Sequence, residues 1–389
     1  MYKIQTLNKI SPKGLEHFQR EAYEVASEIL TPDAVVVRSF KMHDMEFDKN
    51  LKAIARAGAG TNNIPIQKCS EKGIVVFNTP GANANAVKEL VLTALFLSSR
   101  DITGGVIWTQ SIANEGENVP SLVEKNKSNF AGCEIKGKKL GVVGLGAIGA
   151  MVANNALDLG MEVIGYDPYI SVEAAWKLSS KVKKATGLET LLSQVDYLTI
   201  HMPLLDSTKG LFNAEKFAMM KNNIKIINFA RGGLVNDDDM LKALESKKVS
   251  SYVTDFPTAK LLNTKGVIPI PHLGASTAES EENCAVMAVE QIKDFLENGN
   301  IKNSVNFPEC ILPRAVGENR LLIANKNIPN MIGKISSILA TNSINISDLL
   351  NKSRDNLAYN IIDVDKQIPD DIAKKLQEIE GIITVRVIK

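Results

Sequence analysis

The segment from Gly144 to Gly149, Gly-Leu-Gly-Ala-Ile-Gly, constrains the fold of this chain more than any other segment. It follows an apolar run at 140–143 that is typical of a buried strand, and it opens a stretch with helical periodicity. In a strand–turn–helix unit the first glycine permits a tight turn and the second lets the backbone approach a ligand. The third allows close packing of the helix on the strand. We therefore predict a parallel α/β fold in this part of the chain.

The same segment predicts a dinucleotide site, because N–H groups at a helix N-terminus bind a pyrophosphate. The residues assigned to the pyrophosphate are Gly144, Gly146, Ala147, Ile148 and Gly149. Asp167 ends the next predicted strand, at 162–166. A carboxylate there accepts hydrogen bonds from the adenosine ribose and repels a 2′-phosphate, which favours NAD over NADP. The alternative is a glycine turn that binds nothing.

The length and charge of the chain exclude several classes of protein. At 389 residues it exceeds the size of one compact core, so we expect two or three domains. Its 44% hydrophobic and 23% charged residues are ordinary for a globular protein. The formal net charge of +1 gives no electrostatic reason to expect nucleic acid or an anionic membrane as a partner. No run of roughly 18 apolar residues predicts a membrane span.

Cysteine usage indicates the compartment. The four cysteines (Cys69, Cys133, Cys284 and Cys310) have no paired spacing that suggests a metal site or a disulfide framework. The N-terminal residues lack the long apolar run of a signal peptide. We therefore expect a reduced, cytoplasmic protein without a metal.

Apolar periodicity divides the chain into two α/β series and a different C-terminal pattern. The predicted elements are strands at 34–37, 52–55 and 73–77, a buried helix at 86–99, an irregular exposed arm or dimer contact at 104–130, strands at 140–143, 162–166, 197–200, 225–228 and 252–254, and a helix at 277–298 capped by Gly299. Residues 306–319 form a predicted linker with prolines and a glycine. Residues 320–389 then follow the order βαββαβ, which is the ferredoxin-like arrangement.

Polar residues gather at the predicted strand ends of the second series. An arginine beside two glycines, Arg231, has its guanidinium free to grip a carboxylate with two bonds. His272, on a loop between a proline and a glycine, can shuttle protons near neutral pH. The residues expected to line the cofactor crevice are His201, Pro203, Ala230, Asp255 and Gly274. The alternatives are a solvated surface arginine and structural histidines, and for His201 a purely structural role.

Three strand-end loops of the first series suit a small phosphorylated acid. Arg38 and Lys41 supply cations for a phosphate, and backbone N–H groups near Gly60 can hold a carboxylate. Ser39 and Asn83 add a hydroxyl and an amide. The alternative is that both cations are plain surface residues.

Taken together, the segments 144–149, 230–235 and 271–277 resemble the D-isomer-specific 2-hydroxyacid dehydrogenases, from about residue 30 to the C-terminus. The resemblance implies a Rossmann-type NAD domain at 99–273, inserted into a discontinuous, flavodoxin-like substrate domain at 1–98 and 274–305, with the active site in the cleft. It implies that Arg231 clamps the substrate carboxylate and the C2 oxygen. His272 would remove the C2 hydroxyl proton while a hydride passes to the nicotinamide.

Within this family the chain most resembles the branch that oxidises 3-phospho-D-glycerate to 3-phosphohydroxypyruvate, the first step of L-serine biosynthesis. Residues 320–389 resemble an ACT domain, which implies L-serine as an effector at Asn327 and Asn345. Two departures are Asn330, where a glycine is usual, and Asn325, where serine-sensing relatives carry a histidine. The alternative for this domain is a structural dimer contact, and we expect a homodimer or homotetramer.

The largest departure from the family is a missing glutamate. The family pairs its histidine with a glutamate after an Asp-x-Phe segment, yet no glutamate occurs between Lys247 and Ala278. Asp255 is one substitute, so we expect His272 to titrate lower than in relatives. Other readings remain open: another D-2-hydroxyacid dehydrogenase (a glyoxylate or hydroxypyruvate reductase, or a D-lactate type), or an NAD-sensing protein like the corepressors built on this fold.

Overall fold

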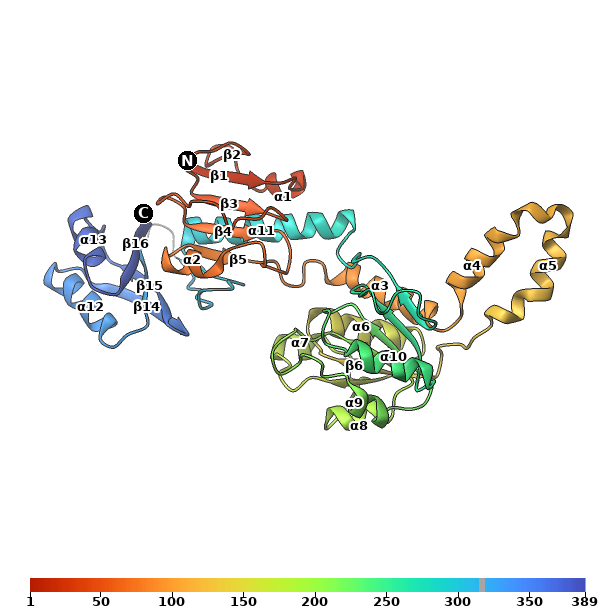
Figure 1. Ribbon diagram of the computed structural model, residues 1–389. Coiled ribbons are helices and arrows are strands. Elements are labelled where there is room, and N and C mark those ends of the chain that lie inside the picture. Colours follow the sequence, from red (N-terminus) through yellow and green to blue (C-terminus); the bar gives the residue numbers. More distant parts are fainter. Residues whose placement is uncertain (315–318, 389) are drawn as a thin grey trace. The chain divides into compact units, whose positions relative to one another are not determined.

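The computed structural model describes residues 1–314 and 319–388 (Figure 1). The chain divides into two compact units, a first unit of Met1–Asn83 with Ala278–Lys389 and a second unit of Ala84–Thr277. Residues 315–318 of the predicted linker lie outside the described residues.

A parallel five-stranded sheet forms the core of the first unit. Its spatial order is β2-β1-β3-β4-β5, the flavodoxin order. The strands are β1 (Tyr2–Leu7), β2 (Tyr23–Ala26), β3 (Ala34–Val37), β4 (Ala53–Arg56) and β5 (Val75–Phe77). All of β3 is buried, as a strand covered on both faces must be. The helices are α1 (Pro12–Leu15), α2 (Ile66–Glu71) and α11 (Ala278–Asn298). Helix α11 ends at Gly299, whose φ of 75° is the left-handed conformation expected of a cap.

A parallel seven-stranded sheet forms the core of the second unit. Its order, β12-β11-β10-β9-β6-β7-β8, is the Rossmann order with one further strand at the edge. The strands are β6 (Lys139–Val143), β7 (Glu162–Tyr166), β8 (Lys183–Lys184), β9 (Tyr197–Ile200), β10 (Ile224–Asn228), β11 (Val249–Thr254) and β12 (Val267–Pro269). The helices beside the sheet are α3 (Ala84–Leu97), α6 (Ala147–Asp158), α7 (Val172–Lys177), α8 (Leu188–Leu192), α9 (Ala214–Met219) and α10 (Asp237–Glu245). The predicted α/β class with both parallel sheets is confirmed.

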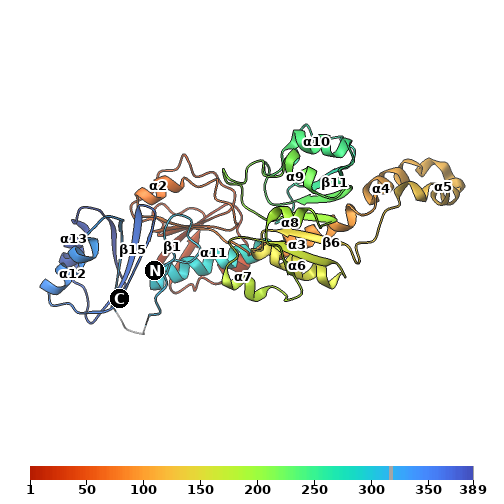
Figure 2. The same ribbon diagram turned by 90° about the horizontal axis from the view of Figure 1, so that it is seen from below.

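The arm at 104–130 is helical, so the prediction of an irregular segment was wrong. It contains α4 (Ile102–Ser111), η1 (Ala113–Asn118), α5 (Val119–Asn126) and η2 (Lys127–Phe130), and it extends away from the rest of the second unit in both views (Figures 1 and 2). The Asp101 side chain caps α4 by accepting from the Gly104 N–H, and the Trp108 and Phe130 rings pack 5.4 Å apart. Neither α4 nor α5 buries a residue, and α4 shows almost no segregation of apolar side chains to one face.

None of the helices in the described ranges is by itself long and apolar enough for a membrane span. Only α3 and α4 together reach the required length and composition, and they are bent by 69° where they meet.

The C-terminal part of the first unit has the predicted βαββαβ order. Its antiparallel sheet runs β14-β15-β13-β16. The elements are β13 (Asn319–Lys326), α12 (Met331–Thr341), β14 (Ile346–Arg354), β15 (Leu357–Val364), α13 (Asp370–Gln377) and β16 (Ile382–Ile388). Alternate residues of β13 face opposite ways: Ile323 joins the apolar core with α12 and α13, whereas Leu322 joins the core of the first sheet and α11.

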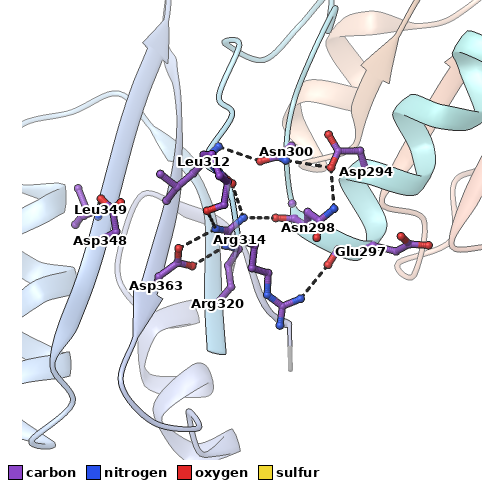
Figure 3. A network of polar contacts seen from close by, with 12 residues as sticks. Asp294, Glu297, Asn298, Asn300, Leu312, Arg314, Arg320, Asp348, Leu349 and Asp363 are labelled. Carbon is purple, nitrogen blue, oxygen red and sulfur yellow. Dashed lines mark hydrogen bonds and ion pairs between the residues drawn. The ribbon is translucent and has the colours of Figure 1, made fainter. Parts of the chain in front are cut away.

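The end of α11 is the main polar contact of this C-terminal domain. The last carbonyl groups of a helix have no partner within the helix. Here each carbonyl oxygen of residues 295–299 accepts a side-chain hydrogen bond, from Arg386 (295 and 296), Arg314 (297), Arg320 (298) and Tyr359 (299). Arg320 is fully buried and forms a two-bond ion pair with Asp363, at 2.6 and 2.7 Å (Figure 3). Cationic donors at a helix C-terminus are stabilising.

Candidate active site

The glycine loop after β6 has the geometry of a pyrophosphate cradle. Gly144 has a φ of 91°, and a Cβ there would lie 2.4 Å from the His201 carbonyl oxygen. A Cβ on Gly149 would lie 1.9 Å from the Gly144 carbonyl oxygen. A Cβ on Gly146 would meet no atom within 4 Å, so packing of the described residues leaves open space at this position. Residues Ala147 and Ile148 start α6, whose N–H groups face the same loop. The loop fits a dinucleotide.

Asp167 lies at the end of β7, the strand beside β6 in the sheet. One carboxylate oxygen accepts from the Leu145 N–H and the other from the Tyr169 N–H, both at 2.8 Å. The carboxylate therefore holds the glycine loop in place while the half-buried side chain stays within reach of a ligand. This is the position from which a ribose is bound in the Rossmann fold.

His201 follows β9, which is the strand beside β6 in the sheet, so His201 lies next to the glycine loop. Its Nε2 and the Thr199 Oγ1 form a hydrogen bond of 2.9 Å, and burial lowers the pKa of His201 to about 4. The imidazole is therefore neutral at physiological pH and suits a wall of the site, not proton transfer. Pro203, two residues on, is exposed, and its carbonyl oxygen accepts from the Thr208 hydroxyl.

The loop after β10 carries Arg231. Asn228 shapes this loop, because its amide donates to the Arg231 carbonyl oxygen at 3.0 Å and accepts from the Ala230 N–H at 3.2 Å. The Arg231 side chain is exposed, and its Nη1 donates to the Ala230 carbonyl oxygen at 2.7 Å. Within the described ranges the guanidinium forms this one hydrogen bond, to a backbone carbonyl group, and it can exchange that bond for a ligand carboxylate.

The loops after β11 and β12 bring Asp255 and His272 together. The exposed His272 ring lies 4.6 Å from the Phe256 ring, and the Asp255 carboxylate interacts electrostatically with both His272 and Arg231. Gly274 is buried beside them, since a Cβ there would lie 3.8 Å from an Asp255 oxygen. The predicted site residues Arg231, Asp255 and His272, which follow strands β10, β11 and β12, therefore lie in one neighbourhood.

Asp255 is an unusual carboxylate. Its side chain is only 3% exposed, and neither oxygen has a hydrogen-bond partner among the described residues. Burial raises the pKa of Asp255 to about 6, while the positive charges of His272 and Arg231 act in the opposite direction. A buried carboxyl group without partners is a candidate for a functional role.

The predicted substrate residues lie in the first unit. Arg38 follows β3 and forms an ion pair of 2.9 Å with Glu281, in the first turn of α11. Ser39 is exposed, and its N–H donates to the Asn8 side chain at 3.0 Å. Arg56 ties the loops together by donating to the carbonyl oxygens of Arg38, at 2.9 Å, and Gly60. Asn83 is half-buried at the start of α3. Sequence reasoning missed Arg56 and Glu281, because the pairing of each depends on a loop that is distant in sequence.

The two predicted effector residues are both exposed in the C-terminal domain. Asn327 donates to the Asp355 carbonyl oxygen at 3.1 Å, and the Asn345 N–H donates to the Asp365 side chain at 3.0 Å. Asn330 has a φ of 67°, so an asparagine adopts here the left-handed backbone that usually favours glycine.

Asn325 is buried and takes part in a chain of amides across the sheet. Its oxygen accepts from Asn360 at 2.7 Å, and Asn360 in turn accepts from Asn351 at 2.7 Å. The amide of Asn325 therefore forms part of the hydrogen bonding across the sheet.

Comparison with known proteins places this geometry in a family. The model of the D-isomer specific 2-hydroxyacid dehydrogenase NAD binding domain matches residues 105–274. The D-3-phosphoglycerate dehydrogenase of Haemophilus influenzae is 34% identical over 340 residues, which cover 85% of this chain and 79% of that protein. The chain belongs to the D-isomer-specific 2-hydroxyacid dehydrogenase family.

Two further relatives of this family mark its range. The hydroxypyruvate reductase of Thermotoga maritima is 36% identical over 291 residues, covering 71% of this chain and 88% of that protein. The NAD⁺-bound 3-phosphoglycerate dehydrogenase structure from Entamoeba histolytica has a TM-score of 0.59 and 27% identity, covering 78% of this chain and 98% of that one. The chain spans 59% to 64% of the length of three other D-3-phosphoglycerate dehydrogenases. As a 2-hydroxyacid dehydrogenase it is an oxidoreductase, and its cofactor is NAD.

Proposed function

We propose that this dehydrogenase oxidises 3-phospho-D-glycerate to 3-phosphohydroxypyruvate, the reaction that opens L-serine biosynthesis. The proposal depends on one observation: Arg231, Asp255 and His272 follow the neighbouring strands β10, β11 and β12, and the charges of Arg231 and His272 act on the buried Asp255 carboxylate. The name and the coverage of the Haemophilus relative support this choice of substrate.

The residues divide the reaction between them. Arg231 binds the substrate carboxylate with two charged hydrogen bonds and fixes the C2 oxygen beside His272. The glycine loop and Asp167 would hold NAD, which when bound would supply the acceptor for the hydride from C2. Neutral His272 takes the C2 hydroxyl proton, so that the C–H and O–H bonds break together and a carbonyl group forms. A base placed in this way contributes on the order of 10²–10⁴-fold.

Asp255 takes the place of the missing glutamate in this scheme. Its carboxylate lies in the neighbourhood of His272, and it stabilises the imidazolium that forms when His272 accepts the proton. Burial opposes the charged form of Asp255, and the positive charge of His272 acts in the opposite direction. We therefore propose that the orienting contact of His272 differs from that in glutamate-containing relatives.

A second candidate is a reductase of an unphosphorylated acid such as hydroxypyruvate. The observation that favours it is the ion pair of Arg38 with Glu281, which occupies the cation proposed for the phosphate. Under the leading proposal, a phosphate displaces Glu281 from Arg38. Under the alternative, Glu281 keeps Arg38 paired while the substrate is bound.

An absorbance assay of NADH with phosphoglycerate, glycerate, hydroxypyruvate and lactate separates the two. We expect phosphoglycerate to give the highest kcat/KM, and we expect Arg38→Ala to raise KM for phosphoglycerate without affecting hydroxypyruvate. Equal kcat/KM for phosphorylated and unphosphorylated acids would exclude the leading proposal.

The role of Arg231 is tested by Arg231→Ala. The substrate carboxylate then stays unpaired. The variant should lose about 2–5 kcal/mol of transition-state stabilisation, which is measured as a lower kcat/KM. NAD affinity, measured by fluorescence titration, should stay within about twofold, because the cofactor loop is separate. An equal loss of NAD affinity would mean that Arg231 binds the cofactor instead.

The remaining parts of the proposal concern regulation, assembly and location. We propose that residues 320–389 act as an ACT domain that binds L-serine at Asn327 and Asn345, whose exposed amides support this role. Calorimetry with millimolar serine tests it, and no heat would leave a dimer contact as the function of this domain. Four free cysteines support a cytoplasmic location. We also propose three sets of boundaries: a substrate domain at 1–98 and 274–305, an NAD domain at 99–273 and a linker at 306–319. The assembly we propose is a homodimer or homotetramer.

A further inference from the structure

A cavity of about 190 Å³ lies within the first unit, where the C-terminal sheet packs on the first sheet. The lining formed by described residues comes from the loop before β4, the turn after α2, the end of α11 and strands β5, β13, β15 and β16. It contains four cations and no carboxylate: Lys49, Lys52, Lys72 and Arg386. Three of these cations come from the first domain and one comes from the C-terminal domain.

The charges of this cavity are only partly compensated, because the Asp33 carboxylate acts on both Lys52 and Arg386 and the Glu46 carboxylate acts on Lys72. Lys52 forms an ion pair with Asp33 at 2.5 Å. In the described part of the chain, Lys49, Lys72 and Arg386 form no ion pair with a carboxylate; Lys72 donates only to the Phe47 carbonyl oxygen, at 3.2 Å. Like charges that face one cavity repel each other, so an anion placed among them would stabilise this arrangement.

Arg386 is half-buried, and one of its guanidinium nitrogens is fully buried. Its Nη2 donates to the carbonyl oxygens of Phe295 and Leu296 at 2.6 and 2.8 Å, and its guanidinium lies 4.7 Å from the Phe295 ring centroid. Its Nη1 is buried and has no hydrogen-bond partner among the described residues. Burial also lowers the pKa of Arg386. Buried polar groups nearly always have a partner, so an incomplete set of bonds around a buried guanidinium indicates a missing negative charge.

We propose that this cavity binds a small phosphate-bearing anion, which bridges Arg386 of the C-terminal domain and the lysines of the first domain. Lysine ammonium groups bind phosphate as point charges, and arginine binds it with two parallel bonds. The volume is below the roughly 300–1,000 Å³ of pockets for drug-sized ligands, which limits the occupant to a small ion or metabolite. Because the anion contacts both domains, its binding stabilises the docked state of the C-terminal domain on the end of α11.

This inference goes beyond the proposed function and does not depend on it. The phosphate group could come from inorganic phosphate or from a phosphorylated acid, so both serve as probes. Calorimetry on the full chain measures the dissociation constant for inorganic phosphate and for phosphoglycerate. The double variant Lys49→Gln, Lys72→Gln removes two exposed cations of the cavity and leaves the core intact. The matched control, Lys334→Gln with Lys366→Gln, removes two exposed lysines of the C-terminal domain outside the cavity.

We expect the cavity variant to weaken binding of inorganic phosphate by roughly tenfold or more, whereas the control stays within about twofold of the natural chain. Phosphate should slow hydrogen exchange of the amides at the end of α11 in the natural chain but not in the cavity variant. If phosphate binds as tightly to the cavity variant as to the natural chain, the inference is wrong. If Arg38→Ala abolishes phosphate binding and the cavity variant does not, the anion belongs to the substrate site and only the present inference fails. Tighter binding of phosphoglycerate than of phosphate, lost in the cavity variant but kept in Arg38→Ala, would assign a phosphorylated acid to the cavity.

Discussion

At the scale of single residues, the protonation state of each group in the site depends on how far the group is buried. His201 is half-buried and Asp255 is buried, and burial favours the neutral form of each: the pKa of the imidazole falls to about 4 and that of the carboxyl group rises to about 6. His272 and Arg231 remain exposed. Since a base must exchange its proton with substrate and solvent, exposure supports the assignment of proton transfer to His272 and not to His201.

The pKa of Asp255 predicts a pH dependence of stability. Between its ordinary value of 3.8 and its folded value of about 6, the folded protein holds more protons than the unfolded chain. The free energy of unfolding therefore falls as pH rises through this window, by about 3 kcal/mol from this group. Asp255→Asn should remove that fall, so the variant should be about 1–3 kcal/mol more stable than the natural chain at pH 7.

Urea titrations at several pH values from 4 to 8 measure this effect. Turnover of Asp255→Asn should fall at the same time, because the imidazolium of His272 loses its carboxylate. If the free energy of unfolding depends on pH in the same way in the natural chain and in the variant, Asp255 is not the group that titrates. A gain in stability without a loss of turnover would leave Asp255 outside the reaction.

At the scale of elements, α11 is the segment that connects the most features of the first unit. Its first turn carries Glu281, which pairs with the predicted phosphate ligand Arg38. Its last carbonyl groups accept hydrogen bonds from arginines of the linker and the C-terminal domain. Charges of the right sign at the C-terminal end of a helix stabilise it, so docking of the C-terminal domain and formation of the last turn support each other.

Breaking the buried ion pair at this end should be costly. Arg320→Met leaves the Asp363 carboxylate buried without its partner, and the free energy of unfolding should fall by about 3–5 kcal/mol. The double variant Arg320→Met, Asp363→Leu should recover much of this loss, because no charge is then left buried. Unfolding titrations with guanidinium chloride measure the free energy of unfolding of both variants. Lys375→Ala, which removes an exposed pair with Asp371, is the control and should change stability by less than about 0.5 kcal/mol. A loss no greater than that of the control would mean that the buried pair does not hold the domain.

At the scale of the whole molecule, the helical arm of the second unit leaves apolar side chains of α4 exposed. Val106 and Ile107 are 52% and 65% exposed on α4, and no residue of α4 is buried. Apolar side chains grouped on an unburied helix favour association with a second copy, which supports the proposed homo-oligomer.

Charge on this arm should therefore break the assembly. We expect Ile107→Asp to convert the oligomer to a smaller species in sedimentation velocity, because a buried carboxylate at an interface has no partner. Leu30→Asp, at a site 97% exposed in the first unit, is the control and should leave the assembly unchanged. An unaltered sedimentation coefficient for Ile107→Asp would exclude α4 as the contact.

The sequence alone determined the features that depend on local geometry. The glycines at 144, 146 and 149, the apolar runs of β3, β9 and β15, and the βαββαβ order all follow from steric and periodic rules that act within a few residues. These rules predicted three strands of the first sheet (β3, β4 and β5), five strands of the second (β6, β7, β9, β10 and β11) and the order of the C-terminal domain. They did not predict β1, β2, β8 or β12. They also failed at 104–130, where α4 has almost no apolar face and neither α4 nor α5 buries a residue.

Only the tertiary structure decided which polar groups meet and which lose their water. Arg56, Glu281 and Arg386 act on partners that lie far away in sequence, and no local pattern marks such pairs. The raised pKa of Asp255 likewise depends on the side chains that cover it, not on its neighbours in the chain. Burial and long-range charge are properties of the packed molecule, because they arise only when distant segments displace water together.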